Sequence, residues 1–239
     1  MTLALRGFAA ELRSCSVRGV DDTERVRRAL SHLPIFPLPG AVLLPHALVP
    51  LHVFEPRYRK MTRDCEEGLR AMALANIPDD DAAGEKPPRV LPVAGVGVLA
   101  RVERLPDGRF NIVLRGAGRV RLVEELRSGE PYRLVRAESL EPSLPPSPRV
   151  AQAADSLKRL VLALSAAQRT PELQALVQLA ARARDPGDLA DVVAGALLSA
   201  PAERQIALET VEILPRLELV TQAAAAALAQ TASHATAPN

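Results

Sequence analysis

The sequence predicts an α+β protein with a β-rich first half and a helical second half. Between residues 31 and 140, short apolar runs alternate with turn residues, which is typical of β-strands. After residue 150, apolar residues recur every three or four positions, which places them on one face of a helix. The length of 239 residues allows one or two domains.

These patterns divide the chain into five segments. We expect an N-terminal extension at residues 1–30 and a small β-barrel at residues 31–141. A proline-rich, semi-rigid linker follows at residues 142–149. The helical part is predicted at residues 150–230, and residues 231–239 are expected to form a disordered tail, because chain termini fray.

The first half begins with two candidate strands and one helix. Leu33–Leu38 carries two prolines, and proline cannot donate to a β-ladder, so this run is predicted to be an edge strand. Leu48–Phe54 is the second apolar run. A short helix is predicted over residues 56–67, because it starts with proline and is followed by Gly68.

Five further runs complete the β pattern. Pro106-Asp107-Gly108 is typical of a hairpin turn, so the runs on either side of it are predicted to pair. Six or seven strands with one inserted helix indicate a small barrel or a sandwich. The five runs are Ala71–Ile77, Val93–Leu105, Phe110–Leu114, Val120–Leu126 and Tyr132–Leu140.

The second half predicts a series of helices separated by prolines. Thr170-Pro171 is a typical helix start, since threonine caps the helix and proline fits its first turn. The Asp-Pro-Gly sequence at 185–187 ends that helix, and Pro201 opens a further one. Pro215 is predicted to interrupt or kink it, with a final helix over residues 216–229.

Charge and composition disfavour several classes of protein. Thirty basic residues face 28 acidic ones and aromatic residues make up 3%, so neither charge nor stacking side chains favour nucleic acid. No apolar stretch approaches the roughly 18 residues of a membrane span, and we expect no membrane partner. Cys15 and Cys65 are expected to be free thiols, and no secretory signal is found, which predicts a cytoplasmic location.

Motifs for catalysis and cofactor binding are missing from the sequence. No Gly-Lys pair exists to build a P-loop, and no serine lies in a G-x-S-x-G turn. His46 and His52 flank an apolar run without a nearby cysteine pair, so a metal site is not predicted. The glycines at 95, 97, 116 and 118 fail the G-x-G-x-x-G pattern and are expected to form bulges or turns. We therefore expect no cofactor, no metal and no enzymatic activity.

Residues 33–62 read LPIFPLPGAVLLPHALVPLHVFEPRYRKMT, and this segment resembles the opening of the LON substrate-binding domain, the N-terminal domain of Lon ATP-dependent proteases. The form of residues 54–58 is most similar to stand-alone LON-domain proteins. Ordered likenesses continue to residue 222, and this resemblance implies a PUA-like β-barrel followed by a helical bundle. The later matching stretches are Gly97–Val102, Leu105–Arg109, Leu114–Arg119, Asp185–Asp191 and Gln205–Thr210.

The resemblance implies a non-catalytic module that recognises unfolded or extended polypeptides, because in the family the ATPase and peptidase chemistry belongs to other domains. A protease or chaperone and weak self-association are the further partners that we expect. The candidate peptide-binding residues are Pro39, Phe54, Arg57 and Tyr58. Phe54 and Tyr58 could instead only fix the short helix to the barrel.

An RNA-binding module is the alternative function, because PUA-like barrels elsewhere bind RNA. Six arginines lie around the predicted hairpin and could contact phosphates. The near-neutral net charge and the shortage of aromatic residues count against this alternative. The six residues are Arg101, Arg104, Arg109, Arg115, Arg119 and Arg121.

Overall fold

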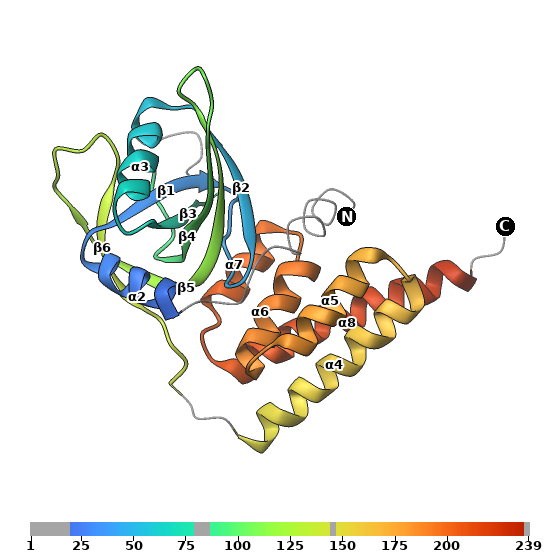
Figure 1. The fold of residues 1–239 in the computed structure, drawn as a ribbon. Helices are drawn as coiled ribbons and strands as arrows, with labels where there is room; N and C mark the ends of the chain where they lie inside the picture. The colour runs from blue at the N-terminus through green and yellow to red at the C-terminus, as the bar shows by residue number, and fades with distance from the viewer. Residues whose placement is uncertain (1–19, 79–86, 144–146, 237–239) are drawn as a thin grey trace. The chain divides into compact units, whose positions relative to one another are not determined.

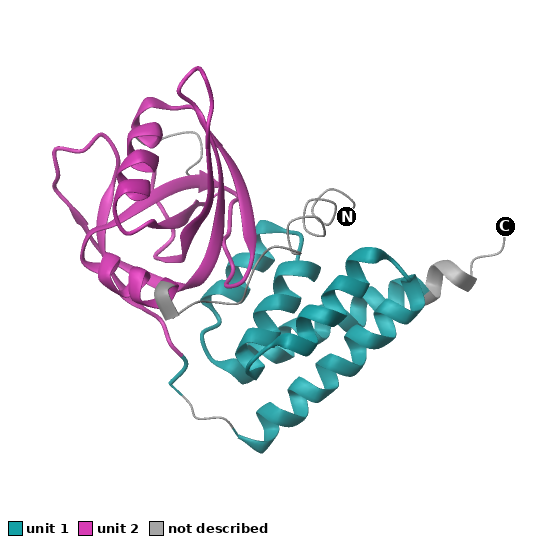
Figure 2. Ribbon diagram, in the orientation of Figure 1, with its two compact units in different colours: residues 1–15, 142–239 teal, residues 16–141 magenta. Residues whose placement is uncertain are grey.

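The computed structural model describes residues 20–78, 87–143 and 147–236, and the chain divides into two compact units (Figure 1; Figure 2). The sheet unit comprises residues 16–141, and the helical unit comprises residues 142–239 together with residues 1–15. Strands fill the first unit and helices fill the second, so the predicted α+β class is confirmed. Cys15 lies outside the described residues.

The described part of the sheet unit contains six strands in the order β2-β5-β4-β3-β1-β6, and a further pairing joins β5 to β6. This pairing closes five strands into a ring, whereas β2 lies outside the ring on β5 alone. The predicted β-rich first half is therefore a closed ring with one additional strand and not a clean barrel. The strands are β1 (Leu33–Pro39), β2 (Leu48–Val53), β3 (Ala71–Ile77), β4 (Val93–Arg104), β5 (Phe110–Leu126) and β6 (Leu134–Ser139).

The long strand β5 replaces the two separate strands predicted at 110–114 and 120–126. Its first part pairs with β2 and its second part with β6, on the same side, while β4 pairs on the other side. Val96 faces Gly118 and Gly97 faces Gly116, so Ala117 is an extra residue at a β-bulge. The glycines continue the strand through this bulge and do not end it.

Strand β1 is not an edge strand, contrary to the prediction from its prolines. It lies between β3 and β6 in the sheet order. Residues Ile35–Pro39 pair in parallel with β3, whereas only Leu33 and Pro34 pair with β6. Over most of its length β1 thus has a partner on one side only, which is the setting in which a sheet tolerates proline.

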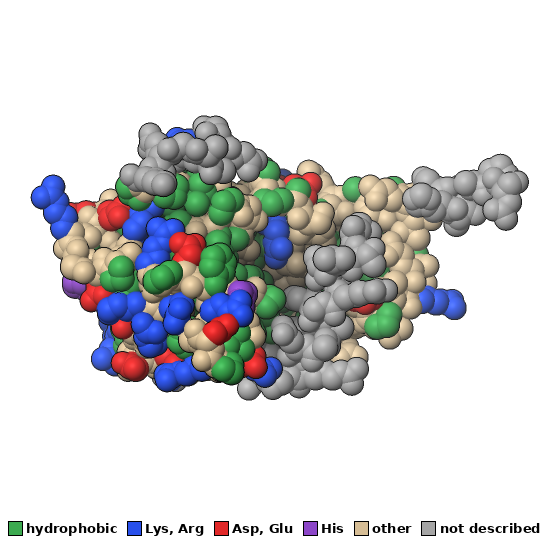
Figure 3. All heavy atoms as spheres, turned by 90° about the horizontal axis from the view of Figure 1, so that it is seen from above, with side chains coloured by type: hydrophobic (Ala, Val, Ile, Leu, Met, Phe, Trp, Pro, Cys, Tyr) green, Lys and Arg blue, Asp and Glu red, His purple; other side chains and the backbone are tan. Residues whose placement is uncertain are grey.

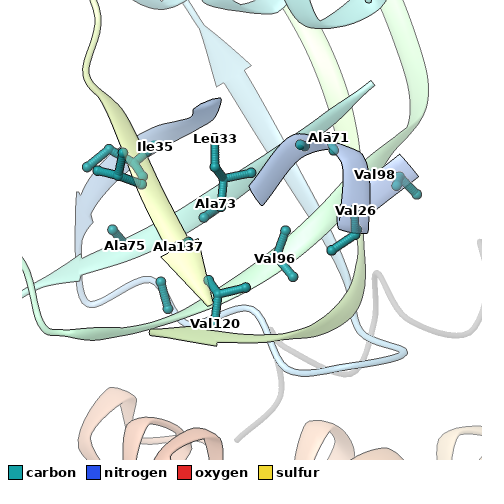
Figure 4. Packing of buried hydrophobic residues seen from close by; sticks show 13 residues of the cluster. Val26, Leu33, Ile35, Ala71, Ala73, Ala75, Val96, Val98, Val120 and Ala137 are labelled. Carbon is teal, nitrogen blue, oxygen red and sulfur yellow. The ribbon is translucent and has the colours of Figure 1, made fainter. Parts of the chain in front are cut away.

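Two hydrophobic cores lie on opposite faces of the sheet, as the alternation along β3 shows. Ala71, Ala73 and Ala75 belong to one core, and Met72 and Leu74 belong to the other. The first, here called the ring core, is lined by all five strands of the ring and consists mostly of Ala and Val (Figure 4). Small side chains suit it because the interior of a five-stranded ring is narrow.

Helix α2 (Val20–Ala29) contributes to the ring core, although residues 1–30 are expected from the sequence to be an extension. Val26 and Ala29 are buried against the sheet (Figure 4). Asp22, itself buried, forms an ion pair with Arg115 on β5. A 3-10 turn, η2 (Leu30–His32), joins α2 to β1.

Helix α3 (Pro56–Glu67) covers the second core, here called the α3 core. It buries Tyr58, Met61 and Cys65 on one face, as expected for an amphipathic helix. Proline occupies its first turn, and the Gly68 N–H donates to the carbonyls of Asp64 and Cys65 at its end. The predicted helix over residues 56–67 is confirmed in both bounds.

The loop of residues 40–47 runs against β4 and β5 and sends buried side chains into the molecule. A Cβ built on Gly95 would overlap the carbonyl oxygen of Leu43, and one on Gly116 would overlap that of Leu44. The His46 N–H donates to the Gly116 carbonyl at 3.0 Å, and the Gly116 N–H donates to the Ala47 carbonyl at 2.9 Å. These two glycines therefore allow backbone to pack directly on backbone.

The helical unit contains five described helices, each starting at or near a proline. Asp185 caps the third, accepting from the N–H groups of Gly187 and Asp188. The helical structure is interrupted at residues 210–212, so Pro215 lies in the first turn of the last helix and does not break it. The helices are α4 (Pro148–Gln168), α5 (Pro171–Arg182), α6 (Pro186–Leu197), α7 (Pro201–Glu209) and α8 (Ile213–Thr236).

A buried ion pair fixes the start of α8. The Nε of Arg216 lies 3.1 Å from Oδ1 of Asp191 on α6, and both side chains are almost completely buried. Arg216 also donates from Nη1 to the carbonyls of Thr210 and Val211, each at 2.8 Å. The sequence predicts a disordered tail from residue 231, but helix α8 continues to Thr236. Residues 237–239 lie outside the described residues.

No described helix combines the length and the apolar composition needed to cross a bilayer.

Gly95→Ala should destabilise the sheet unit by about 2–3 kcal/mol, because an added methyl group has no room against the loop backbone. Urea denaturation of the purified chain measures this loss. Gly129→Ala is the matched control, since nothing lies within 4 Å of a Cβ there. A loss for Gly95→Ala as small as that of the control would contradict the proposed close packing.

Cys65 provides a pH-dependent test of the α3 core. Burial raises the pKa of its thiol to about 12 from an ordinary 9.0. The folded state therefore holds this proton more tightly, so its stabilising contribution is full below pH 9 and is lost as the pH rises toward 12. Two proteins are compared, both with Cys15→Ser and one of them also with Cys65→Ala. Between pH 8 and pH 10, the free energy of unfolding of the protein that keeps Cys65 should fall by about 1 kcal/mol more than that of the other. Parallel pH curves for the two variants would refute the burial of this thiol.

Candidate functional site

The outer edge of β2 is open in the sheet unit, because β2 pairs with β5 and with no other described strand. The hydrogen bond from the Gly116 N–H to the Ala47 carbonyl, together with the regular pairing of β2 with β5, shows which residues of β2 point their backbone groups toward β5. Backbone groups of Val49, Leu51 and Val53 face β5, and those of Leu48, Pro50 and His52 face the open edge. Proline has no backbone N–H, but at position 50 this N–H would point away from β5, so the pairing of β2 with β5 loses no hydrogen bond.

Phe54 is the most exposed large hydrophobic residue among those described, with 60% of its surface accessible. It follows directly after β2, where the strand alternation places the side chains of Pro50, His52 and Phe54 outward and buries Val53. Its ring stacks against the imidazole of His52, with centroids 6.3 Å apart and planes inclined by 26°. An aromatic surface thus stands at the end of an open strand edge.

Polar contacts hold His52 beneath Phe54. The His52 Nδ1 lies 2.8 Å from Oδ1 of Asn111, and its Nε2 lies 3.2 Å from Nη1 of Arg109. Arginine can only donate, so both contacts are satisfied by a neutral imidazole that carries its proton on Nδ1. Arg109 in turn bonds to Asp107 at 2.6 Å, and this contact lowers the pKa of the Asp107 carboxyl.

The structure gives the four predicted site residues different surroundings. Tyr58 is buried, its ring centroid lies 4.2 Å from that of Phe36, and burial raises its pKa. Arg57 is exposed, lies over the Tyr58 ring at 4.5 Å and pairs with Glu55 at 2.8 Å. Tyr58 therefore holds α3 on the sheet, whereas Phe54 and Arg57 face solvent.

Pro39 lies on β1, whereas the other three candidates follow β2 or lie on α3. It ends β1 and is exposed, and the Gly40 N–H beside it donates to Oδ1 of Asn76 at 2.9 Å. The structure thus brings together Phe54, Arg57 and Tyr58 at one junction, here called the β2–α3 junction (residues 52–58). Sequence reasoning considered His52 only as a metal ligand and missed its place under Phe54, although the alternation along β2 could have indicated it.

The six arginines of the alternative RNA-binding function do not form one uncompensated surface. Arg104 pairs with Glu66 at 2.8 Å, Arg109 pairs with Asp107, and Arg115 pairs with Asp22. Arg119 is buried, which leaves Arg101 and Arg121 exposed on β4 and β5. Most of these guanidinium groups thus serve contacts within the sheet unit.

Within the described ranges, no three His, Cys, Asp or Glu side chains are close enough to hold a metal ion. The candidate site is therefore a surface of one open strand edge, one exposed aromatic ring and neighbouring arginines. Such a surface can bind another chain through backbone hydrogen bonds and apolar contact.

Comparison with known proteins defines the family. Residues 32–225 match the family described as the ATP-dependent protease La (LON) substrate-binding domain, and the chain belongs to this family. The Lon protease of Dictyoglomus thermophilum is 29% identical over 192 residues, which cover 79% of this chain and 24% of that protein. The chain spans about a quarter of the length of the curated relatives that it matches. The resemblance stated from the sequence is confirmed.

Two solved structures support the fold. The N-terminal domain of a Mycobacterium avium complex Lon protease has a TM-score of 0.63 at 20% identity, covering 81% of this chain and 98% of that one. A Lon N-terminal domain protein from Xanthomonas campestris has a TM-score of 0.57 at 22% identity, covering 80% and 97%. The arrangement of strands and helices is therefore that of a Lon N-terminal domain.

Truncation of Tyr58 should cost much more folding stability than truncation of Phe54. Tyr58→Ala should destabilise the fold by about 3–5 kcal/mol, because it removes a buried ring and leaves a cavity. Phe54→Ala should change stability by less than about 0.5 kcal/mol, because its ring is mostly exposed. Tyr58→Phe keeps the ring and serves as the control. Equal losses for the two alanine variants in urea denaturation would show that both rings only pin the helix.

Proposed function

We propose that this chain is a non-catalytic recognition module that binds unfolded or extended polypeptide segments in the cytoplasm. The open edge of β2 beside the exposed Phe54 is the observation that carries the proposal. Membership in the LON substrate-binding family supports it, because the family is described by substrate binding. A protease or chaperone would then act on the bound segment.

The bound segment would lie alongside β2 in an extended form. Leu48 and His52 offer both a backbone N–H and a carbonyl on the open edge, whereas Pro50 offers only its carbonyl. Backbone bonds of this kind are independent of the sequence of the ligand, so they suit a module that accepts many chains. The gap at Pro50 limits the number of bonds and favours weak, reversible binding.

Phe54 would supply the apolar contact. Its ring would bury against an apolar side chain of the segment, and burial of one such side chain contributes about 1.5–3 kcal/mol. Arg57 borders the same surface, and Tyr58 keeps α3 and therefore Arg57 in place. Pro39 remains a predicted contact at the end of β1.

A titration of labelled, chemically unfolded polypeptide should show saturable binding with a dissociation constant on the order of 10–1000 µM. Phe54→Ala should weaken binding by about tenfold or more, because an apolar contact of about 1.5–3 kcal/mol is lost. Fluorescence anisotropy provides the measurement. Val123→Ala is the matched control, since Val123 is also exposed but lies in the part of β5 that pairs with β6 and not with β2.

Two outcomes of this titration would contradict the proposal. The first is no saturable binding up to near-millimolar concentration. The second is equal binding by Phe54→Ala and the unmodified chain. The same sample should leave casein intact and should not hydrolyse ATP, and turnover of either would overturn the non-catalytic assignment.

A further inference from the structure

The charges on either side of Phe54 are strongly one-sided. Residues 52–63 contain four cationic side chains, on Arg57, Arg59, Lys60 and Arg63, and only one carboxylate, on Glu55. The face seen in Figure 3 shows Lys and Arg side chains interspersed with hydrophobic and acidic ones on the sheet unit. The segment of chain around Phe54 therefore holds more cations than carboxylates.

The charge pattern of α3 runs against the preference of its own backbone. Its first half carries three of the four cations and its first turn has no acidic residue, whereas Asp64, Glu66 and Glu67 lie toward its end. The aligned peptide dipoles of a helix favour the opposite arrangement. A local preference that is overridden in this way is expected where a side chain serves a function other than stability.

The individual contacts show which cations remain available to a ligand. Lys60 is held between Asp64 at 2.7 Å and Glu130 at 2.8 Å. Among the residues that the structure describes, Arg57 forms an ion pair with Glu55 alone, two residues away, and both side chains are about half exposed. An exposed pair of this kind contributes little, so a carboxylate of a ligand can replace Glu55.

Two more guanidinium groups lie at the turn between β4 and β5. Arg59 packs against the turn between β4 and β5, where a Cβ on Gly108 would overlap its guanidinium. Arg109 follows that turn and contacts His52, on which Phe54 stacks. Arginine suits carboxylates because its planar group donates two parallel hydrogen bonds.

We propose that the β2–α3 junction selects segments in which an apolar or aromatic residue is flanked by acidic residues. This inference rests on the proposed function and adds to it a preference among polypeptides. Phe54 takes the apolar residue, and Arg57 and Arg59 take the flanking carboxylates. A basic flank is rejected because like charges would meet at the junction.

Three labelled peptides of equal length test the preference. Each carries a central Phe, flanked by Asp and Glu, by Ser and Gly, or by Lys. In 50 mM salt the acidic peptide should bind about tenfold more tightly than the basic one, with the neutral peptide between them. Raising the salt to 500 mM should remove most of this difference, because exposed charges are screened.

The double variant Arg57→Glu, Arg59→Glu should reverse the order of acidic and basic peptides, with the neutral peptide still between them. The matched control is Arg121→Glu with Arg136→Glu, which changes the net charge equally at exposed positions on β5 and β6. Far-UV circular dichroism and thermal unfolding check that both variants fold. If the glutamate variant unfolds, Arg57→Gln with Arg59→Gln should still abolish the preference.

The outcomes separate this inference from the proposed function. Equal binding of all three peptides, with loss on Phe54→Ala, would overturn the charge preference and leave polypeptide recognition standing. Equal loss of the preference in the control variant would show an effect of net charge and overturn the assignment to the junction. Binding of none of the peptides would overturn both.

Discussion

Direct backbone packing of the loop at residues 40–47 on β4 and β5 is the contact on which the sheet unit depends. Leu43 and Leu44 approach so closely that only glycine fits opposite them, at positions 95 and 116. Leu43 then completes the α3 core, beside Met72 and Leu74 from β3. Since packed interiors tolerate little change of volume, this loop has essentially one position available to it.

The same contact places the candidate site. Hydrogen bonds between the loop and Gly116 set the register in which β2 joins β5, and that register decides which backbone groups of β2 face outward. Phe54 directly follows the last residue of β2, so the alternation along the strand points its side chain outward. Tyr58, buried against Phe36, fixes the helix that comes next. The exposed ring and the neighbouring arginines thus stand on a rigid support, which reduces the entropy lost when a ligand binds.

The β2–α3 junction combines features that would be costly in a purely structural element. It has an unpaired strand edge, an exposed aromatic ring and a helix whose charges oppose its dipole. Pro50 limits the danger of the open edge, because a strand edge with an incomplete row of donors is a poorer template for aggregation. An edge that is open but incomplete suits transient contact with many chains better than permanent association with one.

The sequence by itself determined the elements of local origin. The helix over residues 56–67, the hairpin turn at 106–108, the helix start at Thr170 and the helix break at residues 185–187 follow from proline, glycine and capping residues, whose effects reach only a few residues. The motifs between residues 33 and 222 also sufficed to indicate the LON family. Only the tertiary structure decided that β1 lies inside the sheet, that β5 is one strand shared by β2 and β6, and that Phe54 is exposed while Tyr58 is buried. These features depend on pairing and packing between residues far apart in the chain, and the period of a single segment carries no information about its partners.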